Sequence, residues 1–396
     1  MTYPILTAAI LIEATGAALN NAGSDPDAGR LGNAVVVKQI RIGRQSYPYI
    51  SGQAVRRWWR ETLYADFGWN PSPVTREAKS AYTQGDPITY ADDDMFGYMA
   101  AKKATKKAKV KEKGAVELAE SLLEDEGDAA KSDPEESGGT QRRVSPLKNS
   151  LLVSVLPNVI TTDFGHFSRD LPVDNANMVP FEHQHYSATM QGVFTISLTD
   201  VGRFECGPMR DIHAQFKSDD VTQVQETDGL SKPRVLAISE GERRTRVAET
   251  IEALGRLRYG ANLTRNLSDV APVVILGAYL DGGNAPFQNL FTPDENSQVQ
   301  LNLKRLASVL KDYGKYLLGA KHLYFGFRPG ILSNEAEVLQ AFGVGPETND
   351  DGKARDGANK PVSFEGVTVQ VGTPGEIVEM LAREARTGGV VPEVKA

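Results

Sequence analysis

The 396-residue chain has almost no cysteine and no long uncharged apolar run, and these two absences narrow its class. Cys206 is its single cysteine, which excludes an internal disulfide and favours a reducing compartment. No apolar run approaches the roughly 20 residues of a membrane-spanning helix. The apolar start, Ile5 to Ile12, lacks a basic flank and runs into Glu13, so we expect a β-strand there rather than a signal peptide. These features predict a soluble, cytoplasmic protein with no membrane partner.

The sequence also lacks a strong catalytic or metal-binding motif. It has neither a Gly-x-Ser-x-Gly nucleophile motif nor a glycine-rich phosphate loop followed by Lys and Ser or Thr. His183 and His185 could share one strand face as a metal pair, but no further ligands follow at a suitable spacing. Asp163-Phe-Gly165 matches one motif of protein kinases, but the other kinase motifs are missing from the sequence. The motif therefore does not predict a kinase. We therefore expect a protein that is not an enzyme, with no catalytic residues, no metal and no cofactor.

The net charge of −7 is concentrated in one segment. Ten acids and two lysines give residues 112–136 a net charge of −8, so the rest of the chain carries +1. A near-neutral body can still hold a local basic groove, so the overall charge does not exclude a nucleic-acid partner. Just before the acids, seven lysines fall within residues 102–113. They could hold phosphates without sequence preference, or form a solvated helix that pairs with the acids.

Hydrophobic patterning predicts an α+β protein with helices packed on one face of an antiparallel sheet. We expect strands at 4–13, 34–42, 151–156, 192–198, 272–280 and 322–327, and helices after Ser51 and at 241–258 and 302–318, with Gly260 as a helix stop. Residues 157–188 have little helical period and predict a long loop or an excursion. We expect a single domain over 1–345, with a charged flexible insertion at 100–143 and a flexible C-terminal extension at 346–396.

Residues 47–63 are the most informative stretch, because they predict an extended segment that runs into an anion-binding helix. Ser51 is a good N-cap, and the amides of Gly52 and Gln53 would be unpaired donors at the positive end of the helix. One polar stripe at helical spacing is formed by Gln53, Arg56, Arg57 and Arg60, opposite the apolar Val55, Trp58, Trp59 and Leu63. An ordinary surface helix with solvated arginines has the same spacing, so both interpretations stay open.

A second candidate lies in the excursion. His166, Ser168 and Arg169 place a ring, a hydroxyl and a guanidinium on one segment. Such a set can stack on bases and contact phosphates.

Several motifs together resemble the DevR-type Cas-seven family of the RAMP superfamily, the backbone subunit of type I-B CRISPR Cascade complexes. The motifs are Asn20-Asn21-Ala-Gly23, Lys38, residues 47–61, Met95-Phe-Gly-Tyr98, Ser145-Pro-Leu147, Asp163-Phe-Gly165, Pro180-Phe-Glu-His-Gln184 and Tyr259-Gly-Ala-Asn262. They keep the family's order over most of residues 1–290, and residues 47–63 are the most specific part. The resemblance implies a modified RNA-recognition (ferredoxin-like) palm with inserted fingers and a β-hairpin thumb at 157–188.

The resemblance also implies the function and the partners. The chain would bind guide RNA (crRNA), stack head-to-tail with other copies of itself, and hold the guide for pairing with target DNA. Other partners would be the remaining Cascade subunits, namely Cas-five, Cas-eight, the small subunit and Cas-six. The RNA-binding residues predicted from the motifs and from the resemblance are Asn21, Lys38, Ser51, Gly52, Gln53, Arg56, Arg57, Arg60, His166, Ser168, Arg169, Asn262 and Arg265.

Two alternatives belong to other functional classes. Relatives of this fold in type III complexes cleave RNA with a loop aspartate, and Asp25 and Asp27 lie in the first long loop, although Asp with Pro and Gly is also ordinary turn chemistry. A transcription regulator is suggested only by the historical name DevR, and no helix-turn-helix is visible in the sequence.

Overall fold

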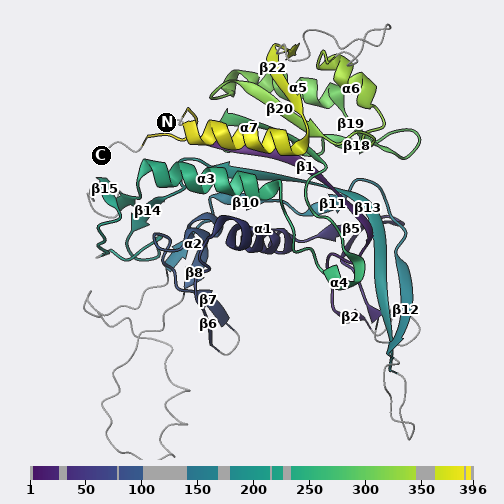
Figure 1. The fold of residues 1–396 in the computed structure, drawn as a ribbon, viewed down its shortest axis with the longest axis horizontal. Helices are drawn as coiled ribbons and strands as arrows, with labels where there is room; N and C mark the ends of the chain where they lie inside the picture. Colours follow the sequence, from purple (N-terminus) through teal and green to yellow (C-terminus); the bar gives the residue numbers. More distant parts are fainter. Residues whose placement is uncertain are drawn as a thin grey trace, which may run out of the picture.

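The computed structural model describes residues 3–25, 34–77, 80–100, 141–167, 179–214, 216–225, 233–344, 362–387 and 389–393. A 13-stranded, mostly antiparallel sheet forms the centre of this part of the chain (Figure 1). Its strands follow the order β21 (Val362–Phe364), β22 (Val367–Gly372), β20 (His322–Phe327), β17 (Val274–Asp281), β1 (Pro4–Ala17), β13 (Val179–Ser197), β11 (Leu152–Ser154), β5 (Gln45–Ile50) and β4 (Gln39–Ile42). Four short strands join beside this path: β2 (Ser24–Asp25), β3 (Ala34–Val35), β10 (Leu147–Asn149) and β12 (Thr161–Phe167).

Strand β1 lies in the middle of the sheet, which confirms the strand predicted at the start of the sequence. Ile10 is paired with Gly192 of β13 on one side and with Ile275 of β17 on the other. The side chains of β1 are buried on both faces from Pro4 to Ile12. This two-sided burial explains why the strand reads as a continuous apolar run and not as an alternating one.

Helices cover both faces of the sheet, so the prediction of helices on one face is wrong. One apolar core joins α1 (Gly52–Phe67), α3 (Glu240–Leu254) and α7 (Pro374–Thr387) to the even-numbered residues of β1. A second core joins α5 (Leu303–Tyr313), α6 (Glu335–Ala341) and the hairpin β18 (Phe291–Pro293)–β19 (Val299–Leu301) to the odd-numbered residues of β1. The amphipathic period of α5 predicts that one side of this helix is buried, but it does not predict which face of the sheet the helix covers. The second helix layer could therefore not be predicted.

The C-terminal part of the chain is ordered, which corrects the prediction of a flexible extension over 346–396. Strands β21 and β22 extend the sheet beyond β20, and β22 runs parallel to β20. Helix α7 buries Ile377, Val378 and Leu381 against the core that holds α1 and α3. Residues 345–361, which include the start of the predicted extension, lie outside the described residues. Strands β21 and β22 therefore belong to the same sheet, and α7 to the same core, as the elements before residue 345.

Other predicted boundaries shift for local reasons. Helix α3 ends at Leu254, well before Gly260, and α5 ends at Tyr313 and is followed by the short 3-10 helix η1 (Gly314–Tyr316). The predicted run at 34–42 is divided into β3 and β4. The ends of the predicted insertion at 100–143 are ordered, because β8 (Tyr98–Ala100) pairs with β9 (Gln141–Arg143). Residues 101–140, with both charge blocks, lie outside the described residues.

The described part of residues 157–188 forms strands, whereas the hydrophobic pattern predicted a loop or an excursion and the family resemblance predicted a β-hairpin. Strands β12 and β13 pair antiparallel from Thr161 opposite His185 to Phe167 opposite Val179, and the pair projects from the body of the molecule (Figure 1). The remaining elements are α2 (Ala91–Phe96), α4 (Leu263–Asn266), the hairpin β6 (Val74–Glu77)–β7 (Ser80–Thr83) and the sheet of β14 (Arg203–Cys206), β15 (Thr222–Gln225) and β16 (Arg234–Ala237). None of the helices in the described ranges is long and apolar enough to span a membrane.

Candidate nucleic-acid interface

The N-terminus of α1 has the geometry of an anion site. Ser51 has extended backbone angles, and its hydroxyl accepts a hydrogen bond from the amide of Ala54 at 3.3 Å. The amides of Gly52 and Gln53 find no acceptor within the described part of the chain. Two backbone donors at the positive end of a 16-residue helix therefore stay available to a ligand. This agrees with the sequence prediction for these three residues.

The predicted arginine stripe divides into side chains with different surroundings. Arg57 is exposed, with 80% of its side chain accessible and only a long 3.8 Å ion pair to Glu61. Gln53 is exposed on the same side of the helix. Arg56 instead turns towards α2 and β10, where it donates to the carbonyl oxygens of Phe96 and Leu147. The sequence predicted one solvent-facing stripe, and the structure corrects this because neighbouring carbonyl groups bind one of its members.

Arg60 takes an intermediate position between exposure and burial. Its guanidinium lies over the ring of Phe96, with Cζ 4.3 Å from the ring centroid, and that of Arg56 lies 5.2 Å from the same centroid. Burial and the neighbouring charge of Arg60 lower the pKa of Arg56 to about 10, and burial lowers the pKa of Arg60 as well. Both groups remain charged at neutral pH, so two cations share one side of α1.

Lys38 and Asn21 lie in the segments that approach the start of α1. The carbonyl of Lys38 accepts from the amide of Tyr49, two residues before the N-cap. The Lys38 amide donates to Oδ1 of Asn20 at 3.0 Å. Asn20, which follows the end of β1, therefore holds the backbone of Lys38 in place. Asn21 is exposed, and its Oδ1 accepts from the amide of Gly23 at 2.6 Å. Asn20 belongs to the motif Asn20-Asn21-Ala-Gly23, but it is not among the residues predicted to bind RNA.

The loop around α4 joins three parts of this surface. The Nδ2 of Asn262 donates to the carbonyl of Ala18 at 2.8 Å, and Asn262 has a left-handed backbone with φ of 57°. Asn266 contacts His185 of β13 at 3.4 Å. At the start of the loop, Arg258 forms an ion pair with Asp66 of α1. The backbone of Arg265 lies in α4, but the structure does not describe its side chain. These contacts place the loop beside the C-terminal half of α1 and the end of β1.

The projecting pair β12–β13 contributes polar and apolar side chains. His166 is exposed on β12, and Phe164 on the same strand is 58% exposed. Ser168 and Arg169, predicted with His166, lie outside the described residues. At the base of the pair, a cavity of about 450 Å³ is lined by Gly16, Asn158, Val159, Thr161, His185, Tyr186 and Ser187.

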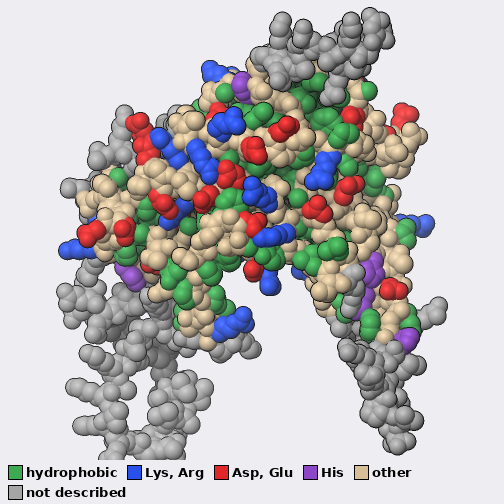
Figure 2. Space-filling model, in the orientation of Figure 1, with side chains coloured by type: hydrophobic (Ala, Val, Ile, Leu, Met, Phe, Trp, Pro, Cys, Tyr) green, Lys and Arg blue, Asp and Glu red, His purple; other side chains and the backbone are tan. Residues whose placement is uncertain are grey.

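The surface below α1 is concave. Figure 2 shows a broad hollow between the hairpin β6–β7 and the pair β12–β13, with Lys and Arg side chains along its upper rim. Such a hollow with basic groups at its rim suits an extended polyanion. The hollow also brings together elements that are far apart in the sequence.

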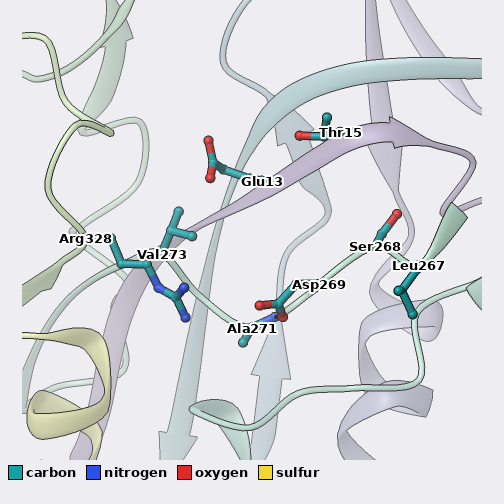
Figure 3. Close-up of a pocket in the computed structure, with 8 residues that line it drawn as sticks. All are labelled: Glu13, Thr15, Leu267, Ser268, Asp269, Ala271, Val273 and Arg328. Atoms are coloured by element: carbon teal, nitrogen blue, oxygen red, sulfur yellow. Dashed lines mark hydrogen bonds between the residues drawn. The ribbon is translucent and has the colours of Figure 1, made fainter.

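A second concave surface has the opposite electrostatic character. A pocket of about 200 Å³ lies beside the end of β1, and Figure 3 shows the carboxylates of Glu13 and Asp269 together with the guanidinium of Arg328 around it. Its other lining residues are Thr15, Leu267, Ser268, Ala271 and Val273. Two carboxylates against one arginine disfavour a phosphate group here, so this pocket is not part of the candidate interface.

Metal-ligating residues do not gather within the described ranges. No three His, Cys, Asp or Glu side chains there lie close enough to hold a metal ion. His183 and His185 of the predicted pair both lie on β13, and the ring of His183 packs edge-on against Phe181. Asp25 lies in β2, and Asp27 lies outside the described residues.

Together, the fold and this surface define a mixed α/β protein built on a large, mostly antiparallel sheet with one basic concave side. The particular family follows from sequence comparison. The chain belongs to the CRISPR-associated DevR/Csa2 family, described as negative auto-regulator DevR/Csa2, whose profile matches residues 9–296. The resemblance read from the motifs is thereby confirmed.

Solved structures and curated sequences were compared as well. A chain of a "CRISPR RNA-guided surveillance complex" is similar at 11% identity and a TM-score of 0.41, over 84% of this chain and 92% of that chain. A chain of a "CRISPR RNA-guided surveillance complex, pre-nicking" is similar at 11% identity and a TM-score of 0.40, over 96% of this chain and 99% of that chain. No curated protein sequence gave a significant match.

Proposed function

We propose that this chain is the guide-RNA-binding backbone subunit of a type I-B CRISPR Cascade complex. The observation on which this rests is the exposed side of α1, where the unpaired amides of Gly52 and Gln53 lie one turn from the exposed Arg57. Backbone amides and a mobile guanidinium recognise phosphate and not base identity. A subunit that repeats along any guide needs this kind of sequence-independent contact. Membership of a CRISPR-associated family supports the same assignment.

The order of the central elements supports an RNA-recognition-type palm as part of this proposal. Along the chain, β1 is followed by α1, β11, β13, α3 and β17. In the sheet these strands lie in the order β17, β1, β13, β11, and all three neighbouring pairs are antiparallel. This is a βαββαβ unit with both helices in one core, as in ferredoxin-like proteins. The pair β12–β13 would then be the thumb and the hairpins β6–β7 and β8–β9 the bases of the fingers.

The proposal includes the partners that such a subunit needs. In the cytoplasm the chain would bind crRNA, stack head-to-tail on further copies of itself as an open filament, and meet Cas-five, Cas-eight, the small subunit and Cas-six. Target DNA would be recognised by pairing with the guide and not by side chains. We propose that the chain is a scaffold without catalytic activity and that it has neither a cofactor nor a membrane partner.

The direct test is a charge reversal on the exposed side of α1. We expect Arg57→Glu to weaken binding of a labelled single-stranded RNA of mixed sequence by about tenfold, because one attractive phosphate contact becomes repulsive. The matched control is Arg305→Glu on α5, an exposed arginine on the opposite side of the sheet, which should leave affinity unchanged. Equal effects of the two variants would show that α1 is not the RNA surface. Sequencing of the RNA that co-purifies with the wild-type chain would identify the guide.

A cleavage assay separates the scaffold from the nuclease alternative. The purified complex is incubated with complementary RNA and a divalent metal, and we expect the RNA to stay intact. Cleavage that is lost in Asp25→Ala or Asp27→Ala would overturn the non-catalytic part of the proposal and leave the RNA-binding part standing.

A further inference from the structure

The motif Met95-Phe-Gly-Tyr98 has a structural explanation in α2 that points back to α1. Met95 is fully buried in the core, and Phe96 is 4% exposed at the end of the helix. Gly97 has φ of 68°, and a Cβ there would lie 2.6 Å from the carbonyl oxygen of Arg143. Any other residue at this position would therefore displace the chain that follows Phe96. The position of the Phe96 ring is fixed from both sides.

The ring of Phe96 is covered by arginine side chains of α1. Arg60 and Arg56 both lie over it, at 4.3 Å and 5.2 Å from its centroid. Contacts of this kind orient a guanidinium through the face of the ring and leave its N–H edge unoccupied. An aromatic platform of this kind fixes an arginine without using its hydrogen-bond donors.

Arg56 and Arg60 use their donors differently. Arg56 donates to Leu147 O at 2.6 Å, to Ser145 Oγ at 3.0 Å and to the carbonyl of Phe96. Arg60 makes no hydrogen bond and no ion pair to any residue that the structure describes. Arg60 is partly exposed, and none of its nitrogen atoms is among the fully buried, unpaired atoms of the described residues. Arg60 is therefore an oriented guanidinium with unoccupied donors.

Nearby acids do not use these donors. Asp92 accepts from the hydroxyl of Tyr64 at 2.6 Å and from the amide of Ser72 at 3.2 Å. Asp93 accepts from the Ser72 hydroxyl at 2.8 Å and from two backbone amides. The two guanidiniums lie over the same ring and repel each other, and the charge of Arg60 adds to burial in lowering the pKa of Arg56. A bound anion would relieve that repulsion.

We propose that Phe96 is a positioning residue for RNA binding, whose ring holds the Arg60 guanidinium so that its N–H groups meet a backbone phosphate. This inference rests on the function proposed above and names the residue that prepares its binding surface. It explains why the arginines of α1 are followed in the sequence by a short helix that ends in Phe-Gly. The competing explanation is that Arg60 only shields the Phe96 ring from water and contributes to stability alone.

A double-mutant cycle on the full chain distinguishes the two explanations. RNA affinity is measured for wild type, Phe96→Leu, Arg60→Gln and the double variant with a labelled single-stranded RNA of mixed sequence. We expect Arg60→Gln to weaken binding about tenfold, because charge-assisted hydrogen bonds to phosphate are lost. Phe96→Leu should weaken binding severalfold in the wild-type chain and should have no further effect when Arg60 is already Gln. Thermal unfolding is recorded for each variant to separate stability from affinity.

The salt dependence of binding provides a second readout that a structural role would not change. Loss of one phosphate contact should reduce the slope of log affinity against log salt by about 0.7 for single-stranded RNA. We expect this reduction in Arg60→Gln and a change of the same sign in Phe96→Leu. The control is Phe342→Leu, a fully buried phenylalanine in the other core, which should lower stability without changing the slope.

The outcomes separate this inference from the proposed function. An equal loss of affinity from Phe96→Leu in both backgrounds, or no loss at all, would overturn the positioning role. If Arg60→Gln binds RNA as the wild type does, the inference fails while the proposed function stands on Arg57. If the wild-type chain binds no RNA, the proposed function itself fails.

Discussion

Helices α1 and α3 lie in the same core and begin in the same way, but their arginines have opposite surroundings. Each helix has a serine N-cap that accepts from the third residue of the helix, and Trp59 of α1 donates to the Thr250 carbonyl of α3 at 2.7 Å. Arg246 of α3 is 3% exposed and lies 2.8 Å from Asp94, whereas the side chain of Arg57 is 80% exposed. A row of arginines therefore does not identify a nucleic-acid surface, because the acceptors around each side chain decide its role.

Two arginines of α3, Arg243 and Arg246, connect distant segments of the chain. Arg243 donates to the carbonyls of Leu198, Thr199, Val201 and Pro392. Asp94 accepts from Arg246 and also from Arg143 of β9. This network ties the base of the predicted insertion to α2, α3 and the sheet. Buried arginines of this kind are tolerated only when their donors are satisfied.

The largest effect should come from breaking this network. We expect Arg246→Met to lower the free energy of unfolding by about 3 kcal/mol, because Asp94 then keeps a buried charge with one fewer partner. Arg57→Met should change the free energy of unfolding by less than about 0.5 kcal/mol, because this side chain is exposed. Urea denaturation of both variants gives the two values. Similar losses in both would contradict the division of roles between the helices.

A smaller loss of stability, equal in the two helices, is expected when either N-cap is removed. Ser51→Ala and Ser239→Ala should each cost about 1 kcal/mol, because each removes one cap to the amide of Ala54 or Glu242. RNA affinity should fall only in Ser51→Ala, because only the N-terminus of α1 lies on the proposed interface. A parallel loss of affinity in Ser239→Ala would mean that the effect reflects stability and not the site.

The smallest effect concerns Asp93 of α2, the helix that contacts both α1 and α3. Burial raises the pKa of Asp93, against hydrogen bonds from the Ser72 hydroxyl and the Asp86 amide that lower it. A carboxyl whose pKa is raised in the folded state contributes stability at low pH and loses it as the pH rises through that folded-state value. As the pH rises above about 4, wild type should therefore lose stability relative to Asp93→Asn. Urea midpoints for both proteins at several pH values test this, and a difference independent of pH would refute it.

Local sequence patterns predicted much of the fold but not its layers. The strands at 4–13 and 322–327 are confirmed, because each is a short apolar run, and the helix after Ser51 is confirmed, because it combines a helical period with an N-cap. The flexible extension predicted over 346–396 is wrong for residues 362–387, which form β21, β22 and α7. Helix α7 is stabilised by packing against α3, a contact between segments more than 100 residues apart that no local pattern reveals.

The sequence predicted which residues of α1 lie at the candidate site, but it did not predict their contacts with distant parts of the chain. Ser51, Gln53 and Arg57 lie where helical spacing placed them, since an N-cap and a 3.6-residue period depend only on neighbours in the chain. Arg56 was misplaced, because its acceptors come from Phe96 and Leu147, which lie 40 and 91 residues away. The role of Asn20 was missed for the same reason, since its partner, Lys38, lies across a loop.

The sequence by itself determined the family of the chain, the central strand and the serine N-cap with unpaired amides at the start of α1. These depend on composition, on periodicity and on a cap, all of which act over a few residues. Only the tertiary structure decided which arginines are connectors and which face solvent. That decision depends on where distant carbonyls, carboxylates and the ring of Phe96 come to lie once the sheet has brought them together. Burial without acceptors is costly, so the packed fold assigns each guanidinium its role.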